Sequence, residues 1–313
     1  MKSNRQTTLG SCVTITGIGV HSGLPATLSI GPADADTGYL FVRTGLEGGD
    51  REVRASAEAV IATEFATVLG DSSGPLVSTA EHVLASLRGM GVDNAIIEVD
   101  GPEVPIMDGS AAPFVEAIEQ AGIIQLREPR RFIEIIKPVR VVIGESVGEL
   151  VPYAHGFRAE IEIDFAHPQI GHQAYALELS AKAFQRDICR ARTFGCMNDV
   201  AKLWSAGYAR GASLENAIVY DETCVLNSEG LRYRDEFVRH KVLDAVGDLA
   251  LAGLPLLGLY RSVRGGHKLN NAVLRALMAD RSAWRIVEAS PAARRGHAEV
   301  PAALAAAFAP DLS

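Results

Sequence analysis

The sequence has few cysteines, few aromatic residues and no long hydrophobic run. Its cysteines, Cys12, Cys189, Cys196 and Cys224, form no Cys-x-x-Cys pair, which argues against a cysteine zinc site and a secreted disulfide framework. No stretch approaches the ~20 apolar residues that a membrane-spanning helix requires, and the N-terminus lacks a signal-peptide core. We therefore expect reduced thiols, a cytoplasmic location and no transmembrane segment.

Basic residues are also scarce. The 30 Lys and Arg residues against 38 Asp and Glu residues give a net charge of -8, and no dense basic run occurs, which argues against a nucleic-acid partner. A chain of 313 residues with 48% hydrophobic residues indicates a globular protein. Because single cores stop growing near ~250 to 300 residues, we expect two domains. We also expect a monomer.

Strand-like and helix-like segments follow one another in both halves of the chain. β-branched runs broken by Gly, Pro and Asp predict strands over residues 6–60, 132–143, 157–165 and 256–263. Helices are predicted over residues 78–90, 111–122, 180–192 and 235–253. This order indicates an α+β fold rather than a doubly wound sheet.

The charged, proline-broken segment 125–132 is interpreted as the domain boundary. It divides the chain into a first α+β domain, 1–128, and a second, 129–288. The remaining residues, 289–313, are rich in Ala and Pro, and we expect a loosely held tail.

The predicted helix 235–253 carries His240, Asp244 and Asp248 at four-residue steps, opposite an apolar arc. A solvated polar face is the ordinary interpretation of this pattern. However, Asp is a poor residue in the middle of a helix, so two of them need compensation. A histidine and an aspartate one turn apart can converge on one ion, which makes a metal site the alternative.

Two further segments leave the same choice open. In "STAEH", Ser78 and Glu81 fit a capping box; alternatively His82 is a metal ligand and Glu81 is a general base beside the metal. In "RGGHKLNN", His267 follows two glycines at an apparent helix start, where it is either a cap or loop residue or an acid catalyst.

Taken together, six sequence blocks between Gln6 and Leu277 resemble one family. They are "GIGVHSG", "STAEH", "GVDNAIIEVDGPEVPIMDGSAAPF", "RARTFG", "LNSEGLRYRDEFVRHKVLDAVGDL" and "GGHKLNN". In this order they resemble UDP-3-O-acyl-N-acetylglucosamine deacetylase, the zinc enzyme of lipid A biosynthesis in Gram-negative bacteria. The resemblance implies two similar layered domains, each a mainly antiparallel sheet with helices, packed with the helices between the two sheets.

The resemblance also implies roles for individual residues. It implies that zinc is bound by His82, His240 and Asp244, a set that also suits Fe²⁺. Its implied catalytic residues are Glu81 as general base, His267 as general acid, Asp248 as the carboxylate that orients His267, and Thr193 as a hydroxyl that helps hold the oxyanion.

For substrate binding the resemblance implies a set of basic and aromatic residues. The set comprises Lys241 and Arg264 near the sugar and diphosphate, Phe165 stacked on uracil, Phe194 as an apolar wall, and His21. Residues 195–220 match an insert that forms a hydrophobic passage for the acyl chain. Cys196 and Ala212 depart from the family pattern on this passage, so the resemblance predicts no chain length.

The leading hypothesis is hydrolysis of the N-acetyl group of UDP-3-O-(3-hydroxyacyl)-N-acetylglucosamine, a small-molecule substrate. The products are acetate and UDP-3-O-(3-hydroxyacyl)-glucosamine, and the reaction is the committed step of lipid A biosynthesis. One alternative is a non-catalytic paralogue that binds a UDP-sugar or a lipid and regulates the pathway. Another is a deacetylase of the same fold for a different acylated sugar nucleotide. A mere binder needs neither a base nor an acid, which favours an enzyme.

Overall fold

The computed structural model describes residues 4–289, and its layers follow from the hydrophobic pattern of the strands. In β3 (Pro25–Gly31) every second residue is buried, including Leu28 and Ile30, so one face of the strand packs on the core. The strand β14 (Phe157–Asp164) alternates in the same way. Sheets built from such strands need a covering layer on one face only.

Two large sheets form the outer layers. The N-terminal sheet has the order β2 (Val13–Ile18), β3, β9 (Ala95–Val99), β4 (Tyr39–Arg43), β5 (Arg51–Arg54). The C-terminal sheet contains β12 (Val139–Ile143), β13 (Ser146–Val151), β18 (Leu256–Val263), β11 (Arg131–Ile135) and β19 (Trp284–Glu288), with β14 beside β18 and β15 (His172–Glu178) beside β14. Most pairs are antiparallel, whereas β4–β9, β11–β18 and β14–β18 are parallel.

Three smaller sheets complete the strands of the described residues. They are β1 (Arg5–Leu9) with β10 (Ile123–Pro129), β6 (Val60–Ala62) with β7 (Val68–Asp71) and β8 (Gly74–Val77), and the parallel pair β16 (Phe194–Cys196) and β17 (Ile218–Tyr220).

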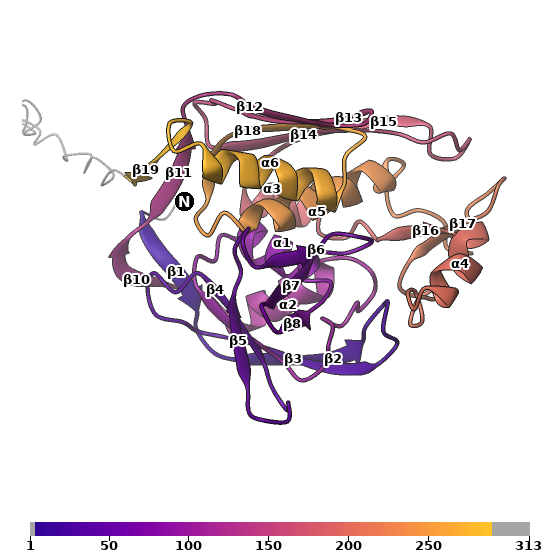
Figure 1. The fold of residues 1–313 in the computed structure, drawn as a ribbon, viewed down its shortest axis with the longest axis horizontal. Helices are drawn as coiled ribbons and strands as arrows, with labels where there is room; N and C mark the ends of the chain where they lie inside the picture. The colour runs from indigo at the N-terminus through magenta and orange to yellow at the C-terminus, as the bar shows by residue number, and fades with distance from the viewer. Residues whose placement is uncertain (1–3, 290–313) are drawn as a thin grey trace, which may run out of the picture.

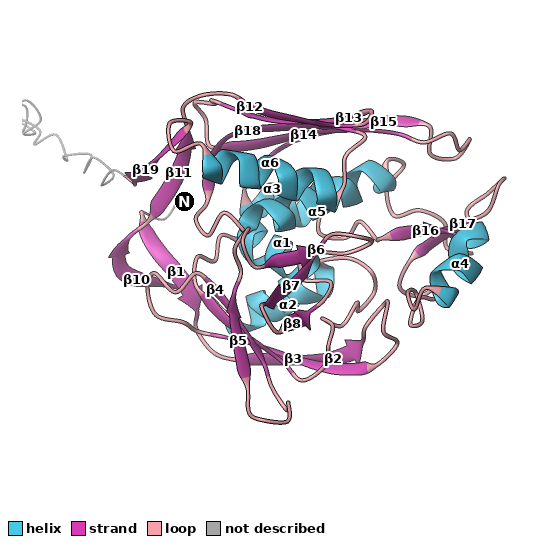
Figure 2. Ribbon diagram, viewed as in Figure 1, coloured by secondary structure: helices cyan, strands magenta, loops and turns pink. Residues whose placement is uncertain are grey.

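The helices lie between the two large sheets, as Figures 1 and 2 show. The helices of residues 4–289 are α1 (Glu81–Met90), α2 (Ala112–Ala121), α3 (Ala181–Asp187), α4 (Val200–Ser205), α5 (Glu236–Ala250) and α6 (His267–Ala279), with a 3₁₀ turn at Met197–Asp199. Helix α1 packs against α5, and α6 packs against α5 and the C-terminal sheet. The expected α+β architecture with helices between the sheets is confirmed.

Gly247 allows α1 and α5 to approach closely. A Cβ atom at this position would lie 2.1 Å from the carbonyl oxygen of Glu81. Glycine is otherwise unfavourable inside a helix, by roughly 0.5–1 kcal/mol relative to alanine. The close approach brings the first residues of α1 against the middle of α5, where the candidate functional residues lie.

The segment 125–132, which we interpret as the domain boundary, contains the end of β10, which pairs with β1, and the start of β11 at Arg131. The structure corrects one local expectation. Helix α3 ends at Asp187 rather than near Arg192, because the chain beyond it turns to place the amide of Thr193 against the carbonyl of Gly109.

The predicted tail 289–313 lies outside the described residues except for Ala289, whose amide donates to the carbonyl of Arg130. Within residues 4–289, no helix is both long and apolar enough to cross a membrane. All four cysteines are free.

Candidate metal centre

The α1–α5 contact brings together His82, His240 and Asp244, whose ligand atoms all lie within 4.8 Å of one another. The Nε2 atoms of the two histidines lie 3.8 Å and 3.3 Å from Asp244 Oδ1. Ligands of a tetrahedral zinc site at ~2.0–2.1 Å from the metal are about 3.4 Å apart, so the spacing fits a metal. All three side chains are at most 3% exposed. The ordinary interpretation of this arc as a solvated face is therefore wrong.

The hydrogen bonding of Asp244 and His240 also fits a metal. Asp244 Oδ1 is buried and has no hydrogen-bond partner among the described residues, although two imidazole nitrogens face it. Buried polar atoms are rarely left without a partner, so this oxygen is a candidate for coordination to a cation. His240 Nδ1 lies 3.0 Å from the carbonyl oxygen of Ala191, an interaction that leaves Nε2 free to coordinate.

The electrostatics keep both imidazoles in the form that binds metals. Burial, followed by the charge of His240, lowers the pKa of His82 to about 3. Burial also lowers the pKa of His240, although Asp244 opposes the effect. Neutral imidazole is a metal ligand. Lys241 is the cation nearby: burial alone would lower its pKa, but Asp244, 3.0 Å from its Nζ, outweighs burial and raises that pKa.

Glu81 is the first residue of α1, and its carboxylate is not part of a capping box. The N-cap residue is Ala80, and no side chain caps the helix. Instead Glu81 Oε2 accepts a hydrogen bond of 3.0 Å from the amide of Thr67. The predicted capping box is wrong because Thr79, at φ 58°, turns the chain before the helix and leaves Ser78 in a bridge with Glu103. Burial raises the pKa of Glu81 to about 7, although the charge of His267 opposes this.

His267 faces Glu81 across the site. It begins α6, its Nε2 lies 3.8 Å from Glu81 Oε1, and its Nδ1 lies 2.9 Å from Asp248 Oδ2. Asp248 Oδ2 also accepts a hydrogen bond of 2.8 Å from Asn270. Burial alone would lower the pKa of His267, but Asp248 and then Glu81 outweigh it and raise that pKa to about 10. The site therefore holds an imidazolium beside a carboxyl group that titrates near neutrality.

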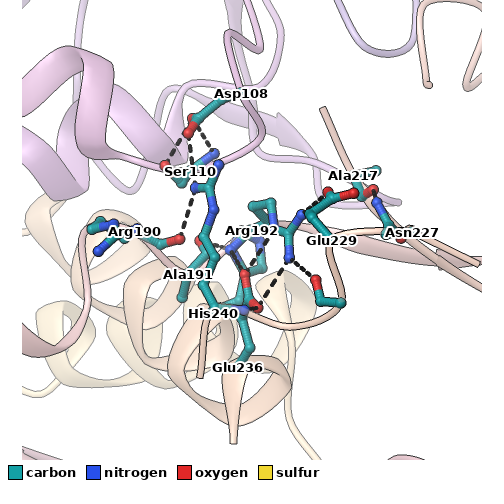
Figure 3. A network of polar contacts seen from close by, with 12 residues as sticks. Asp108, Ser110, Arg190, Ala191, Arg192, Ala217, Asn227, Glu229, Glu236 and His240 are labelled. Atoms are coloured by element: carbon teal, nitrogen blue, oxygen red, sulfur yellow. Dashed lines mark hydrogen bonds and ion pairs between the residues drawn. The ribbon is translucent and has the colours of Figure 1, made fainter. Parts of the chain in front are cut away.

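Two buried positions that support the site were missed in the sequence. Arg192 and Glu236, both at most 1% exposed, form an ion pair of 2.9 Å at the start of α5, of which Glu236 is the first residue (Figure 3). Arg192 lies between Ala191, whose carbonyl oxygen faces His240 Nδ1, and Thr193. Both charged residues stand inside sequence blocks quoted above, but a single charge in such a block gives no sign that it is buried.

Thr193 and Phe194 lie where the chain enters β16, and Phe194 contacts His240, one of the candidate metal ligands. The carbonyl of Thr193 accepts a 2.8 Å hydrogen bond from the amide of Ile218, which fixes the start of β16. The ring of Phe194 lies 6.1 Å from that of His240 and 5.8 Å from that of Phe165, and Lys241 Nζ lies 5.3 Å from its centre. Three of the expected substrate-binding residues, Phe165, Phe194 and Lys241, thus form one continuous group.

The other two expected substrate residues have different surroundings. Arg264 is 40% exposed and forms ion pairs with Glu145 and Asp164. His21 lies 5.4 Å from the ring of Tyr208, in the segment 195–220, and 6.4 Å from that of Phe65. Burial lowers the pKa of His21, although Glu103 opposes this.

The segment 195–220 projects from the body between β16 and β17 (Figure 1). None of the α4 residues is buried, and Trp204 is 58% and Met197 50% exposed. Leu214, 48% exposed, is a third large apolar side chain on the surface of this segment.

Two buried imidazoles and a carboxylate converge, and Glu81 and His267 lie beside them, an arrangement typical of hydrolytic enzymes. The model of the UDP-3-O-acyl N-acetylglycosamine deacetylase (LpxC) family matches residues 6–279, and the chain belongs to this family. Relatives named UDP-3-O-acyl-N-acetylglucosamine deacetylase from Brucella ovis, Brucella abortus and Brucella melitensis are each 48% identical over 285 residues. The match covers 91% of this chain and 99% of each relative.

Proposed function

We propose that this protein is a zinc-dependent deacetylase of UDP-3-O-(3-hydroxyacyl)-N-acetylglucosamine. It hydrolyses the N-acetyl amide to acetate and the free 2-amino sugar nucleotide. The observation that carries the proposal is the unpartnered, buried Asp244 Oδ1, which two neutral imidazoles face at 3.3 and 3.8 Å. Family membership and the printed names of the relatives support the choice of substrate.

The residues beside the ligands suit the steps of amide hydrolysis. His82, His240 and Asp244 would hold the zinc ion, which would supply Lewis acidity that polarises a carbonyl and makes water more acidic. Glu81 removes a proton from the attacking water, a role that its pKa of about 7 favours near neutral pH. His267, which Asp248 keeps cationic, protonates the departing nitrogen. An amine is a poor leaving group, so this protonation is required.

The remaining site residues bind charge and apolar surface. The Thr193 hydroxyl helps to hold the oxyanion, and Lys241 lies on the Phe194 ring, where its ammonium group can contact the sugar or diphosphate. Phe165 stacks on uracil, His21 lies near the same end of the substrate, and Arg264 lies near the sugar and diphosphate. The insert 195–220 receives the acyl chain, each buried CH₂ of which contributes about 0.8 kcal/mol.

The proposed setting of the reaction follows from its substrate. We place it at the committed step of lipid A biosynthesis, in the cytoplasm, catalysed by a monomer. The native metal is Zn²⁺, with Fe²⁺ as the other ion that a His/His/Asp set accepts.

The direct test uses the purified protein, its metal content and acetate release from UDP-3-O-acyl-N-acetylglucosamine. We expect one metal ion per chain, turnover that a chelator abolishes, and recovery on adding Zn²⁺. Metal-loaded protein that binds the substrate without releasing acetate would refute catalysis and favour a regulatory binding protein. Turnover only of another acylated sugar nucleotide would refute the substrate.

Variants separate the base from the ligands. Glu81→Gln should keep the metal and lose most turnover, whereas His240→Ala should lose the metal. His172→Ala is the matched control, because the His172 side chain is 60% exposed and forms a surface ion pair with Glu162. This variant should keep both the metal and the turnover. Equal metal loss in the Glu81 and His240 variants would show that base and ligand have been confused.

A further inference from the structure

Thr67 contacts both halves of the candidate site. It lies between β6 and β7 and is 1% exposed. Its amide donates to Glu81 Oε2 over 3.0 Å, and its hydroxyl donates to Asp248 Oδ1 over 2.6 Å. Its carbonyl accepts a 3.2 Å hydrogen bond from the amide of Ala80, just before α1. One residue thus joins the loop, α1 and α5.

These contacts exceed what is needed to bury a threonine. A buried hydroxyl is usually satisfied by nearby backbone, whereas this one reaches a carboxylate 181 positions away along the chain. The loop is also held in an unfavourable conformation, with Phe65 at φ 63°, a region that non-glycine residues seldom adopt. Strain of this kind persists only where surrounding contacts determine the conformation.

The hydroxyl determines how Asp248 meets His267. Asp248 Oδ2 contacts His267 Nδ1 at 2.9 Å and accepts from Asn270 at 2.8 Å, while Oδ1 has Thr67. With both oxygens engaged, the carboxylate cannot rotate about its last bond. Without the hydroxyl, Oδ1 becomes a buried acceptor with no partner, and the carboxylate is free to turn away from the imidazole.

We propose that Thr67 is a positioning residue that couples the Glu81 carboxylate to the Asp248–His267 pair. This inference rests on the proposed function, in which Glu81 is the base and His267 the acid. The amide of Thr67 holds Glu81, the base, and its hydroxyl holds Asp248, the partner of the acid His267. The distance between the base and the acid therefore depends on one residue. Reacting groups displaced by about 1 Å can lose on the order of 100-fold in rate, so a single hydroxyl can matter.

The test compares Thr67→Val, which keeps the shape and the amide but lacks the hydroxyl, with Thr67→Ser, which keeps the hydroxyl. In Thr67→Val we expect kcat to fall about 10- to 100-fold, with KM and zinc content unchanged. Thr67→Ser should recover most of this loss. A kcat in Thr67→Val close to that of the wild type, or a Thr67→Ser variant as slow as Thr67→Val, would overturn the proposal.

Thr7→Val is the matched control for stability. Thr7 is also buried, and its hydroxyl contacts the carboxylate of Asp93 at 3.1 Å near the opposite end of α1. This variant should lose stability like Thr67→Val but keep kcat. An equal loss of kcat in both variants would show that the effect is only structural, against the proposal.

A second measurement does not depend on turnover. In the NMR spectrum of the zinc-loaded protein, the proton between His267 Nδ1 and Asp248 should resonate far downfield. We expect Thr67→Val to broaden or shift this signal and Thr67→Ser to retain it. An unchanged signal in Thr67→Val would overturn the coupling even in an active enzyme, whereas wild-type protein without acetate release would refute the proposed function instead.

Discussion

Truncating Glu236 should destabilise the protein more than truncating any exposed partner of the same arginine. Glu236 is fully buried, and its carboxylate accepts hydrogen bonds from the amide, Nε and Nη2 of Arg192 at 3.0, 2.9 and 3.3 Å, and from the amide of Arg232 at 2.5 Å. Glu236→Ala removes all of these acceptors. The Arg192 guanidinium then keeps only Glu229 and the carbonyl of Gly230, each at 2.7 Å.

The size of the effect follows from burial. Removing one member of a buried ion pair typically destabilises a protein by about 3–5 kcal/mol, because the other charge is left uncompensated. Arg192 retains two partners, so we expect the lower end, about 3 kcal/mol. With an unfolding entropy of about 2.1 cal/mol/K per residue, 1 kcal/mol corresponds to about 1.5 °C in Tm for 313 residues, which predicts a fall of about 4–5 °C.

Urea denaturation of the metal-free protein measures the difference in free energy of unfolding between Glu236→Ala and the wild type. Glu229→Ala is the control, because Glu229 is 55% exposed and pairs with the same guanidinium, and exposed pairs contribute at most about 1 kcal/mol. Metal affinity should fall in Glu236→Ala as well, because Arg192 adjoins the carbonyl that faces His240 Nδ1. If both variants lose the same free energy of unfolding, the reasoning from burial is refuted.

Two further predictions follow from the packing and charge of the site. Gly247→Ala places a methyl group 2.1 Å from the Glu81 carbonyl oxygen, so we expect the free energy of unfolding in urea to fall by about 1–3 kcal/mol and turnover to slow. Gly31→Ala is the control and should change neither, because its added Cβ would make only ordinary van der Waals contacts. The pKa of His267, about 10 in the fold against 6.5 ordinarily, means that its pairing with Asp248 stabilises the protein fully below about pH 6.5 and no longer does so above about pH 10. Urea denaturation should therefore separate Asp248→Asn from the wild type most at pH 6 and least at pH 10; a difference that does not change with pH would contradict the ion pair.

The sequence predicted helix α5 almost to its ends but not the environment of its polar side. An expected span of 235–253 became Glu236–Ala250, because hydrophobic periodicity is a local property. Burial of the opposite face depends on α6 and on α1, and α1 comes from a distant part of the chain. A helical wheel shows which residues share a face, but not what covers that face.

The capping box failed for a related reason. The spacing of Ser78 and Glu81 fits the pattern, but the pattern assumes that the helix begins at Ser78. A turn at Thr79 delays the start and frees Glu81 for the amide of Thr67. The proposed role of Thr67 could not be predicted from the sequence, because Thr67 lies in a loop and its partner Asp248 is far away along the chain.

The position of the site explains why such supporting contacts are needed. The contact between α1 and α5 buries His82, Asp244 and Asp248 together with Glu81. Burial of ionisable groups is unfavourable unless each one is paired, hydrogen-bonded or bound to a metal. Apolar residues of both helices, among them Leu84, belong to one continuous core that holds the contact together. Stability and catalysis are therefore coupled here: metal bound only by the folded protein should raise its stability, because a ligand that binds the native state alone shifts unfolding by mass action.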